Sequence, residues 1–351
     1  MPEVIKTTLE TLELARILAL AAISFAVAII ATPLVTHFLY KYKLGKYIRQ
    51  DAPIFAKLHK HKEGTPTMGG VLIWGTLLIV ISAFALLDAL FENSIFSTFN
   101  FLSRRETLLP LGALVVSAFV GLADDLIGVF KIAPLGKGLR MRHRVFIYTA
   151  IAVIGAWWFF DKLDWDLIAV PYLGEFSIGI AYIPFFIFML VATAFSVNET
   201  DGLDGLAGGV LMMAFGAFGV IAFTQGKFDL AAFTAVISGA LLAFLWFNIP
   251  PARFFMGDTG AMSLGITLGI IAMLTNASLL LPLIGIVLVI ESASVIVQVA
   301  SKKLRGKKIF QSTPIHHHFQ AIGWPESKVV MRLWIISALG VGAGLLIALT
   351  A

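Results

Sequence analysis

Ten apolar runs, each close to the length of a membrane span, constrain the fold of this 351-residue chain more than any other feature. A bilayer requires about 20 apolar residues per helix, and in lipid a spanning segment of this kind must be helical to satisfy its backbone. Composition agrees, with 59% hydrophobic and 13% charged residues, whereas a soluble domain is about one quarter charged. We therefore predict an all-α polytopic membrane protein that forms a single integral-membrane domain over residues 1–351. The expected spans lie near residues 14–40, 67–91, 107–127, 145–160, 178–198, 205–224, 231–248, 258–276, 279–301 and 332–350.

The basic residues set the expected orientation. Alternate loops, at residues 41–66, 128–144, 249–257 and 302–332, hold 20 of the 26 Lys and Arg residues. By the positive-inside rule these loops are cytoplasmic, which places both termini outside the cytoplasmic membrane. On the outer side, residues 161–176 are expected to form a small interfacial hairpin.

The absence of cysteine excludes disulfides and Cys-based metal sites. The acidic residues Glu3, Glu10 and Glu13 do not resemble the basic start of a cleaved signal peptide, so the first span is expected to be retained as an anchor.

The turn at residues 198–209 joins two expected spans and is rich in glycine. Asp201 and Asp204 are three residues apart, so they would share one face if the turn opens a helix. The simpler interpretation is that they cap the following helix. Two carboxylates together with Asn198 at a membrane boundary favour a functional site.

Three further carboxylates fall on the same membrane face. Asp124 and Asp125 end one span, where they either hold a cation or accept a proton, or form a helix-end pair neutralised by Lys131 or the cluster 140–144. Asp258 begins another span, where it alone could be an N-cap. Five carboxylates among basic loops suit Mg²⁺ and a polyanionic ligand, and the combination is typical of phosphoryl transfer.

Other polar and aromatic residues stand out. The internal tract His316–His318 suggests phosphate binding or support of its loop, because three adjacent histidines on a helix cannot converge on one centre. Glu291 and Gln298 are seven apart and are expected to form helix–helix hydrogen bonds. Phe254 and Phe255 either stack on a base or contact lipid.

Five motifs occur in order across the spans: TPTMGG, the DD pair, NxTDGLDGLAGG, WFNxxPARFFMGDTG and PxHHH. Together they resemble the phospho-N-acetylmuramoyl-pentapeptide transferases (translocase I), a branch of the polyprenyl-phosphate hexosamine-1-phosphate transferases. The resemblance implies transfer of phospho-MurNAc-pentapeptide from UDP-MurNAc-pentapeptide to undecaprenyl phosphate, giving lipid I and UMP with Mg²⁺, in peptidoglycan synthesis. It also implies a homodimer in the lipid bilayer and no nucleic-acid partner. Direct attack by the lipid phosphate and a covalent aspartyl intermediate are both compatible with it.

The resemblance assigns roles to individual residues. Asp124, Asp125, Asp258 and His317 would be catalytic, with Asp124 the candidate to deprotonate the lipid phosphate. Asp258 would bind the metal, with Asn198 and Asp201 as further candidates. Residues expected to bind substrate are Lys62, Thr67, Asn198, Asp201, Gly202, Leu203, Asp204, Asn248, Phe255, Gly257, Gln298, His316 and His318.

Four positions depart from the family pattern: Arg144 where Lys is typical, Phe195 where Asn is common, Glu199 where an apolar residue is normal, and Gln320 where Glu is usual. Because of these departures, the nearest alternative is a sister enzyme that transfers GlcNAc-1-phosphate or a related hexosamine phosphate. An ion-coupled transporter is the alternative from another class. It is disfavoured because the carboxylates gather at one face and no internal repeat is visible.

Overall fold

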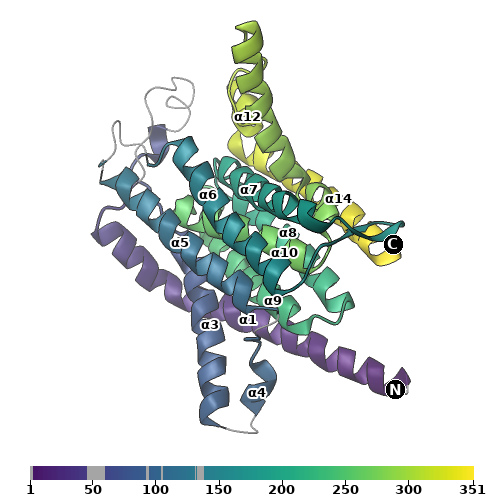
Figure 1. The fold of residues 1–351 in the computed structure, drawn as a ribbon. Helices are drawn as coiled ribbons and strands as arrows, with labels where there is room; N and C mark the ends of the chain where they lie inside the picture. The colour runs from purple at the N-terminus through teal and green to yellow at the C-terminus, as the bar shows by residue number, and fades with distance from the viewer. Residues whose placement is uncertain (1–2, 46–59, 92–94, 104–105, 131, 133–137) are drawn as a thin grey trace.

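The computed structural model is a bundle of long helices, drawn in Figure 1. It describes residues 3–45, 60–91, 95–103, 106–130, 132 and 138–351. Of the basic residues counted above, Lys46, Arg49, Lys57, Lys131 and Lys137 lie outside the described residues, as do Arg104 and Arg105.

Ten long helices account for the ten predicted runs. In chain order they are α1 (Glu3–Lys41), α3 (Gly70–Leu90), α5 (Leu108–Val129), α6 (Met141–Trp157), α7 (Tyr182–Thr200), α8 (Leu206–Thr224), α9 (Phe228–Asn248), α10 (Gly257–Leu274), α12 (Ile286–Arg305) and α14 (Glu326–Thr350). Shorter elements are α4 (Ile95–Phe99), α11 (Leu281–Ile284), α13 (Ile315–Ala321), 3₁₀ turns at Lys60–Lys62, Gly179–Ala181 and Ser278–Leu280, and a π turn at Trp158–Lys162. Within the described residues, nine helices are by themselves long and apolar enough to cross a membrane. The chain is a multi-pass membrane protein.

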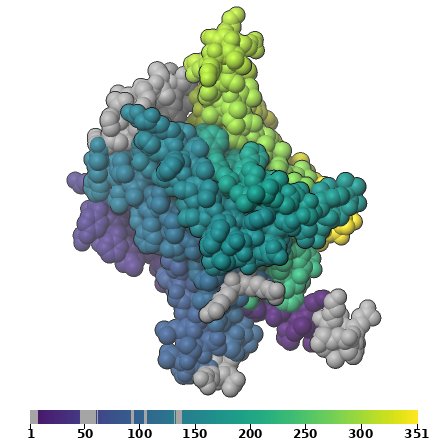
Figure 2. All heavy atoms as spheres, in the orientation of Figure 1, coloured from purple at the N-terminus to yellow at the C-terminus, as the bar shows by residue number. Residues whose placement is uncertain are grey.

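The ninth predicted span, residues 279–301, is not one straight helix. Segments Ser278–Ile284 and Ile286–Arg305 meet at a bend of 82°. The break falls at Gly285, whose ψ of 34° is far from the helical value. Beyond it, α12 projects from the body of the molecule (Figure 2). The prediction of a continuous span was therefore wrong in this segment, because the apolar run continues through a backbone break that hydropathy does not register.

Helix α10 lies at the centre of the packing. It contacts α5, α7 and α3, and nearly all of its residues are buried. Small residues permit this: a Cβ on Gly265 would lie 2.8 Å from the Cα of Ala194 in α7. Without a hydrophobic drive between helices in lipid, such close backbone approach is a main source of association. The first turn of α10 carries Asp258, so the most buried helix positions the key carboxylate.

The two ends of the bundle differ in chemistry. Near the start of α1, Arg16 binds Asp229 at the start of α9 (2.9 Å), and near its end the Tyr40 hydroxyl donates to the Arg253 carbonyl (2.9 Å). The five aspartates of the motifs lie at the second end, near the end of α5, after α7 and at the start of α10, whereas both chain termini lie away from it (Figure 1). Strands β1 (Leu167–Val170) and β2 (Gly174–Ser177) pair antiparallel, which confirms the hairpin.

Which end of the helix bundle faces the cytoplasm stays a prediction.

Candidate active site

Arg144 joins the two carboxylates that the sequence placed in different motifs. One of its terminal nitrogens lies 2.8 Å from Oδ2 of Asp124 and 2.7 Å from Oδ2 of Asp258. The other donates to the Asn198 side-chain oxygen (2.9 Å), and the Asn198 amide donates to Oδ1 of Asp258 (2.6 Å). The ends of α5, α6, α7 and α10 therefore meet in one charged cluster.

Burial distinguishes the two acids. The Asp124 side chain is 0% exposed and that of Asp258 is 18% exposed. Asp124 also accepts a hydrogen bond from the backbone N–H of Leu139. The proposed neutralisation of Asp124 by the 140–144 cluster is thus present in the structure, and it brings the carboxylate into the site. Asp258 is the carboxylate that a ligand reaches first.

Asp125 points away from its neighbour, as adjacent residues on a helix do. Its Oδ2 accepts the backbone N–H of Thr259 (3.0 Å), and its Oδ1 accepts the Thr67 hydroxyl (3.4 Å). From the other side, Asp201 accepts the N–H of Gly257 (3.2 Å). These contacts hold the start of α10 from two directions.

Gly257 occupies this junction because no other residue fits it. Its φ is +74°, and a Cβ there would lie 2.6 Å from both Asp125 Oδ2 and Thr67 Oγ1. We expect Gly257→Ala to lower the free energy of unfolding by about 2–3 kcal/mol through backbone strain and crowding. Denaturant unfolding in detergent measures it, with Gly216→Ala as control because nothing lies within 4 Å of a Cβ there. Equal stability of the two variants would contradict the prediction.

Asp201 and Asp204 do not share a helix face, because α7 ends at Thr200 and α8 begins at Leu206. In the segment between α7 and α8, Gly205 has a φ of +80°, and neither aspartate caps α8. The backbone N–H of Gly205 instead donates to Asn248 (2.9 Å). The turn therefore does not open a helix, so the condition for a shared face is not met, and the capping alternative is wrong; the glycines favour a compact irregular turn over an early helix start.

Asp204 belongs to a second ion cluster. Lys62 lies 2.6 Å from Asp204 and 2.5 Å from Glu326, and Asp204 also accepts the N–H of Ala252 (3.0 Å). The Lys62 ammonium lies 5.9 Å from the centre of the Phe255 ring. Leu203 is buried beside the cluster. The loop at residues 252–256 connects this second cluster to Gly257 and Asp258, and so to the first cluster.

The two phenylalanines of this loop, Phe254 and Phe255, differ in burial. Phe254 is fully buried against Phe244 and Phe247, while Phe255 is only partly buried beneath Lys62. Of the pair, Phe255 is therefore the one with a partly accessible ring for a base, and Phe254 contacts protein instead of lipid.

The histidine tract forms the helix α13, and its three rings face different partners. His316 is buried with Nδ1 2.8 Å from Oε2 of Glu291, and its Nε2 faces Gly202 at a distance that leaves no space for a side chain there. His317 lies 3.2 Å from Gln320. His318 packs against Phe310. His316 thus contacts the 198–209 turn at Gly202.

Glu291 and Gln298 hold the histidine segment instead of bonding to another long helix. Glu291 binds His316, and Gln298 bonds the backbone of Ile309 and Phe310. The expected helix–helix hydrogen bond is therefore confirmed for Glu291, whose partner lies in the short helix α13. It was wrong for Gln298, whose partners lie in the segment between α12 and α13. Gln298 accordingly lies apart from the two ion clusters.

The first cluster suits a hard cation. Oxygens of Asp124 and Asp258 both contact one nitrogen of Arg144, so the two carboxylates lie close enough together for a divalent ion to reach both if it displaced the guanidinium, with the Asn198 oxygen adjacent. No set of three His or acidic side chains that would enclose an ion occurs among the described residues. Mg²⁺ commonly takes one or two carboxylates and completes its shell with water and substrate phosphates, so the donor set fits it.

Two residues of the site were missed by sequence reasoning. Arg144 was noted as a departure from the family and within the 140–144 cluster that could neutralise Asp124, but not as a site residue, and Glu326 was not considered at all. The available signal for Arg144 was its place in a basic loop opposite the carboxylates. Glu326 is an acid at the first turn of α14, and such an acid is commonly explained by the helix dipole.

Comparison with known proteins bears on this arrangement. The model of glycosyl transferase family 4 matches residues 107–276, and the phospho-N-acetylmuramoyl-pentapeptide-transferase signature 1 matches residues 62–73. Proteins named phospho-N-acetylmuramoyl-pentapeptide-transferase include those of Chloroflexus aggregans (37% identical, 96% of this chain and 90% of the relative), Anoxybacillus flavithermus (38%, 92% and 95%) and Shouchella clausii (40%, 90% and 92%).

The chain belongs to the phospho-N-acetylmuramoyl-pentapeptide-transferase family. It is a phosphotransferase, and the transporter interpretation loses its support. The family signature covers Lys62 and Thr67, which the structure places in the second ion cluster and at the Asp125 junction.

Proposed function

We propose that this chain transfers phospho-MurNAc-pentapeptide from UDP-MurNAc-pentapeptide to undecaprenyl phosphate, releasing UMP and forming lipid I. The observation that supports the proposal is the convergence of Asp124, Asp258 and Asn198 on one cationic position at the end of the bundle. A water-soluble nucleotide and a membrane-held lipid must react where the two phases meet. A site at the bundle end, at the cytoplasmic face of the cell membrane, satisfies that requirement.

The chemical step exchanges two bonds at one phosphorus. An oxygen of the lipid phosphate bonds to the phosphorus attached to the sugar, and the bond from that phosphorus to the bridging oxygen breaks, so UMP leaves with that oxygen. Mg²⁺, when bound, offsets the charge of the diphosphate and of the departing UMP. Asp258 and Asn198 would hold the ion, and Asp124 would accept the proton of the lipid phosphate.

The remaining groups would position the substrate. Lys62 and Phe255 supply a cation and a ring on one side, and Asp204 fixes Lys62 in place. Asp125, Asp201 and Gly257 set the start of α10, so we assign them positioning roles. His316 supports the 198–209 turn. Of the three adjacent histidines, His317 is the one that would contact the diphosphate.

The lipid tail has a plausible path beside α7 and α12. The two helices pack together, and α7 also packs on α10. Phe188 of α7 and Ile296 and Val299 of α12 expose 65%, 59% and 59% of their surface, respectively. An amphipathic α12 that bends from the bundle suits a lipid surface. Photocrosslinking of a tail-labelled undecaprenyl phosphate to other helices only would overturn this path.

The test of the function is UMP release by the purified protein with undecaprenyl phosphate and Mg²⁺. UDP-MurNAc-pentapeptide and UDP-GlcNAc are supplied in separate reactions, each with and without a chelator. We expect turnover of the muramoyl substrate only, abolished when the metal is removed. Turnover of UDP-GlcNAc alone would assign the chain to the sister activity. Absence of turnover with either, from folded protein, would contradict the proposal.

A further inference from the structure

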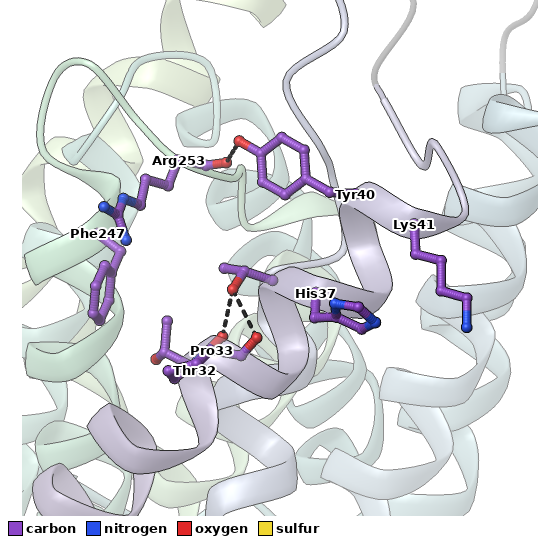
Figure 3. Close-up of a pocket in the computed structure, with 8 residues that line it drawn as sticks. Thr32, Pro33, His37, Tyr40, Lys41, Phe247 and Arg253 are labelled. Carbon is purple, nitrogen blue, oxygen red and sulfur yellow. Dashed lines mark hydrogen bonds between the residues drawn. The ribbon is translucent and has the colours of Figure 1, made fainter.

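A cavity of about 530 Å³ lies between the ends of α1 and α9, outside both ion clusters. It is open at the surface. Figure 3 shows Tyr40 and Arg253 meeting at one edge, with the Phe247 ring below the Arg253 side chain. The side chains that matter come from α1, from the end of α9 and from the stretch after α9: Thr36, His37, Tyr40, Lys41, Phe247 and Arg253. The Lys41 side chain lies on the side of α1 away from Arg253 (Figure 3).

The rim of this cavity is cationic. Arg253 lies 5.6 Å from the centre of the Phe247 ring, which supports its side chain by a cation–π contact. Within the described part of the chain, no carboxylate forms an ion pair with His37, Lys41 or Arg253. The Tyr40 hydroxyl donates to the Arg253 carbonyl (2.9 Å), which ties α1 to the loop. The cavity therefore presents positive charge that no carboxylate of the described residues neutralises through an ion pair.

The face of α1 next to the cavity-lining residues is apolar. Ile30, Leu34 and Phe38 do not line the cavity, but they form a stripe on α1 at a spacing of four residues and expose 78%, 61% and 46% of their surface. The Thr36 hydroxyl donates to the Thr32 carbonyl (2.8 Å), so it places no free donor in the cavity. An apolar stripe that ends at a cationic rim matches a molecule with an anionic head and acyl chains.

We propose that this cavity binds the phosphate headgroup of an anionic phospholipid, with an acyl chain along the exposed stripe of α1. This lipid is a resident of the fold and not the acceptor substrate, and the inference holds whichever sugar phosphate the enzyme transfers. The cavity adjoins the active site through one loop: Phe247 stacks on Phe254 (6.3 Å between ring centres), and the chain from Arg253 continues to Gly257 and Asp258. A bound lipid would thus brace the loop that leads to the metal-proximal carboxylate.

The experiment is native mass spectrometry of delipidated full-length protein titrated with phosphatidylglycerol or with phosphatidylcholine of the same chains. We expect one tight phosphatidylglycerol and much weaker phosphatidylcholine binding. In the double variant Lys41→Gln/Arg253→Gln, the affinity should fall roughly 20-fold, from about 1 kcal/mol per cation. The control Lys307→Gln/Lys308→Gln removes the same charge from an exposed segment and should bind like wild type.

A second variant separates the cavity from its charge. Thr36→Trp fills the space and keeps every cation, and it should also lose the tight phosphatidylglycerol. Inorganic phosphate in excess should not displace the lipid, because the acyl contacts are part of the site. Displacement by phosphate would overturn the lipid assignment in favour of a free phosphate. Equal phosphatidylglycerol binding by wild type and both cavity variants would overturn the proposal altogether.

Discussion

Asp258→Asn is expected to lower kcat for UMP release roughly 10²–10³-fold, the usual effect of removing one charge that stabilises a transition state. Asp258 is the partly exposed acid of the first cluster, 18% against 0% for Asp124, and its two oxygens face Arg144 and Asn198. Asparagine keeps the size of the side chain and removes its charge, so we expect the fold to be retained while the proposed Mg²⁺ site loses a charged ligand.

The measurement is kcat and KM at several Mg²⁺ concentrations. Weaker metal binding should appear as a higher Mg²⁺ requirement in the variant. Asp161→Asn is the matched control, because that acid is 54% exposed at the opposite end of the bundle and pairs only with exposed Lys162 among the described groups. A variant with kcat within threefold of wild type and an unchanged metal requirement would remove Asp258 from the metal site.

Arg144→Ala should lower the free energy of unfolding by about 3–5 kcal/mol, because it leaves a buried carboxylate without its counter-ion. Asp124 is fully buried and pairs with Arg144, and Asp258 and Asn198 lose the same partner in this variant. Denaturant unfolding in detergent at pH 7 measures the loss, with exposed Arg140→Ala as control.

Two companion variants test the cause. Asp124→Asn in the Arg144→Ala background should recover part of the lost stability, since the unpaired charge is then gone. Arg144→Lys should lose only about 1–2 kcal/mol and keep activity, because an ammonium pairs with the carboxylates but lacks the planar fork that also reaches Asn198. Unchanged unfolding of Arg144→Ala would show that the pair contributes nothing to the fold.

The sequence by itself determined where the helices are and at which end of the bundle the acids gather. Hydropathy decides this, because burial of the backbone in lipid forces each long apolar run into a helix. Short connections then return successive helices to the same face, so Asp124, Asn198 and Asp258 had to lie at one end. The hairpin at 167–177 and the family were also predictable, the first from its polar and aromatic residues and the second from motifs in fixed order.

The tertiary structure alone decided which side chains meet. Asp124 and Asp125 are neighbours in sequence, yet one enters the charged cluster and the other binds the start of α10. Glu326 reaches Lys62 across 264 positions, and Arg144 unites three motifs from outside all of them. The bend at Gly285 likewise follows from backbone geometry beneath a continuous apolar run. Hydropathy reports how each segment partitions between water and lipid, whereas pairing of charges depends on helix rotation and close packing, which arise only when the whole bundle assembles.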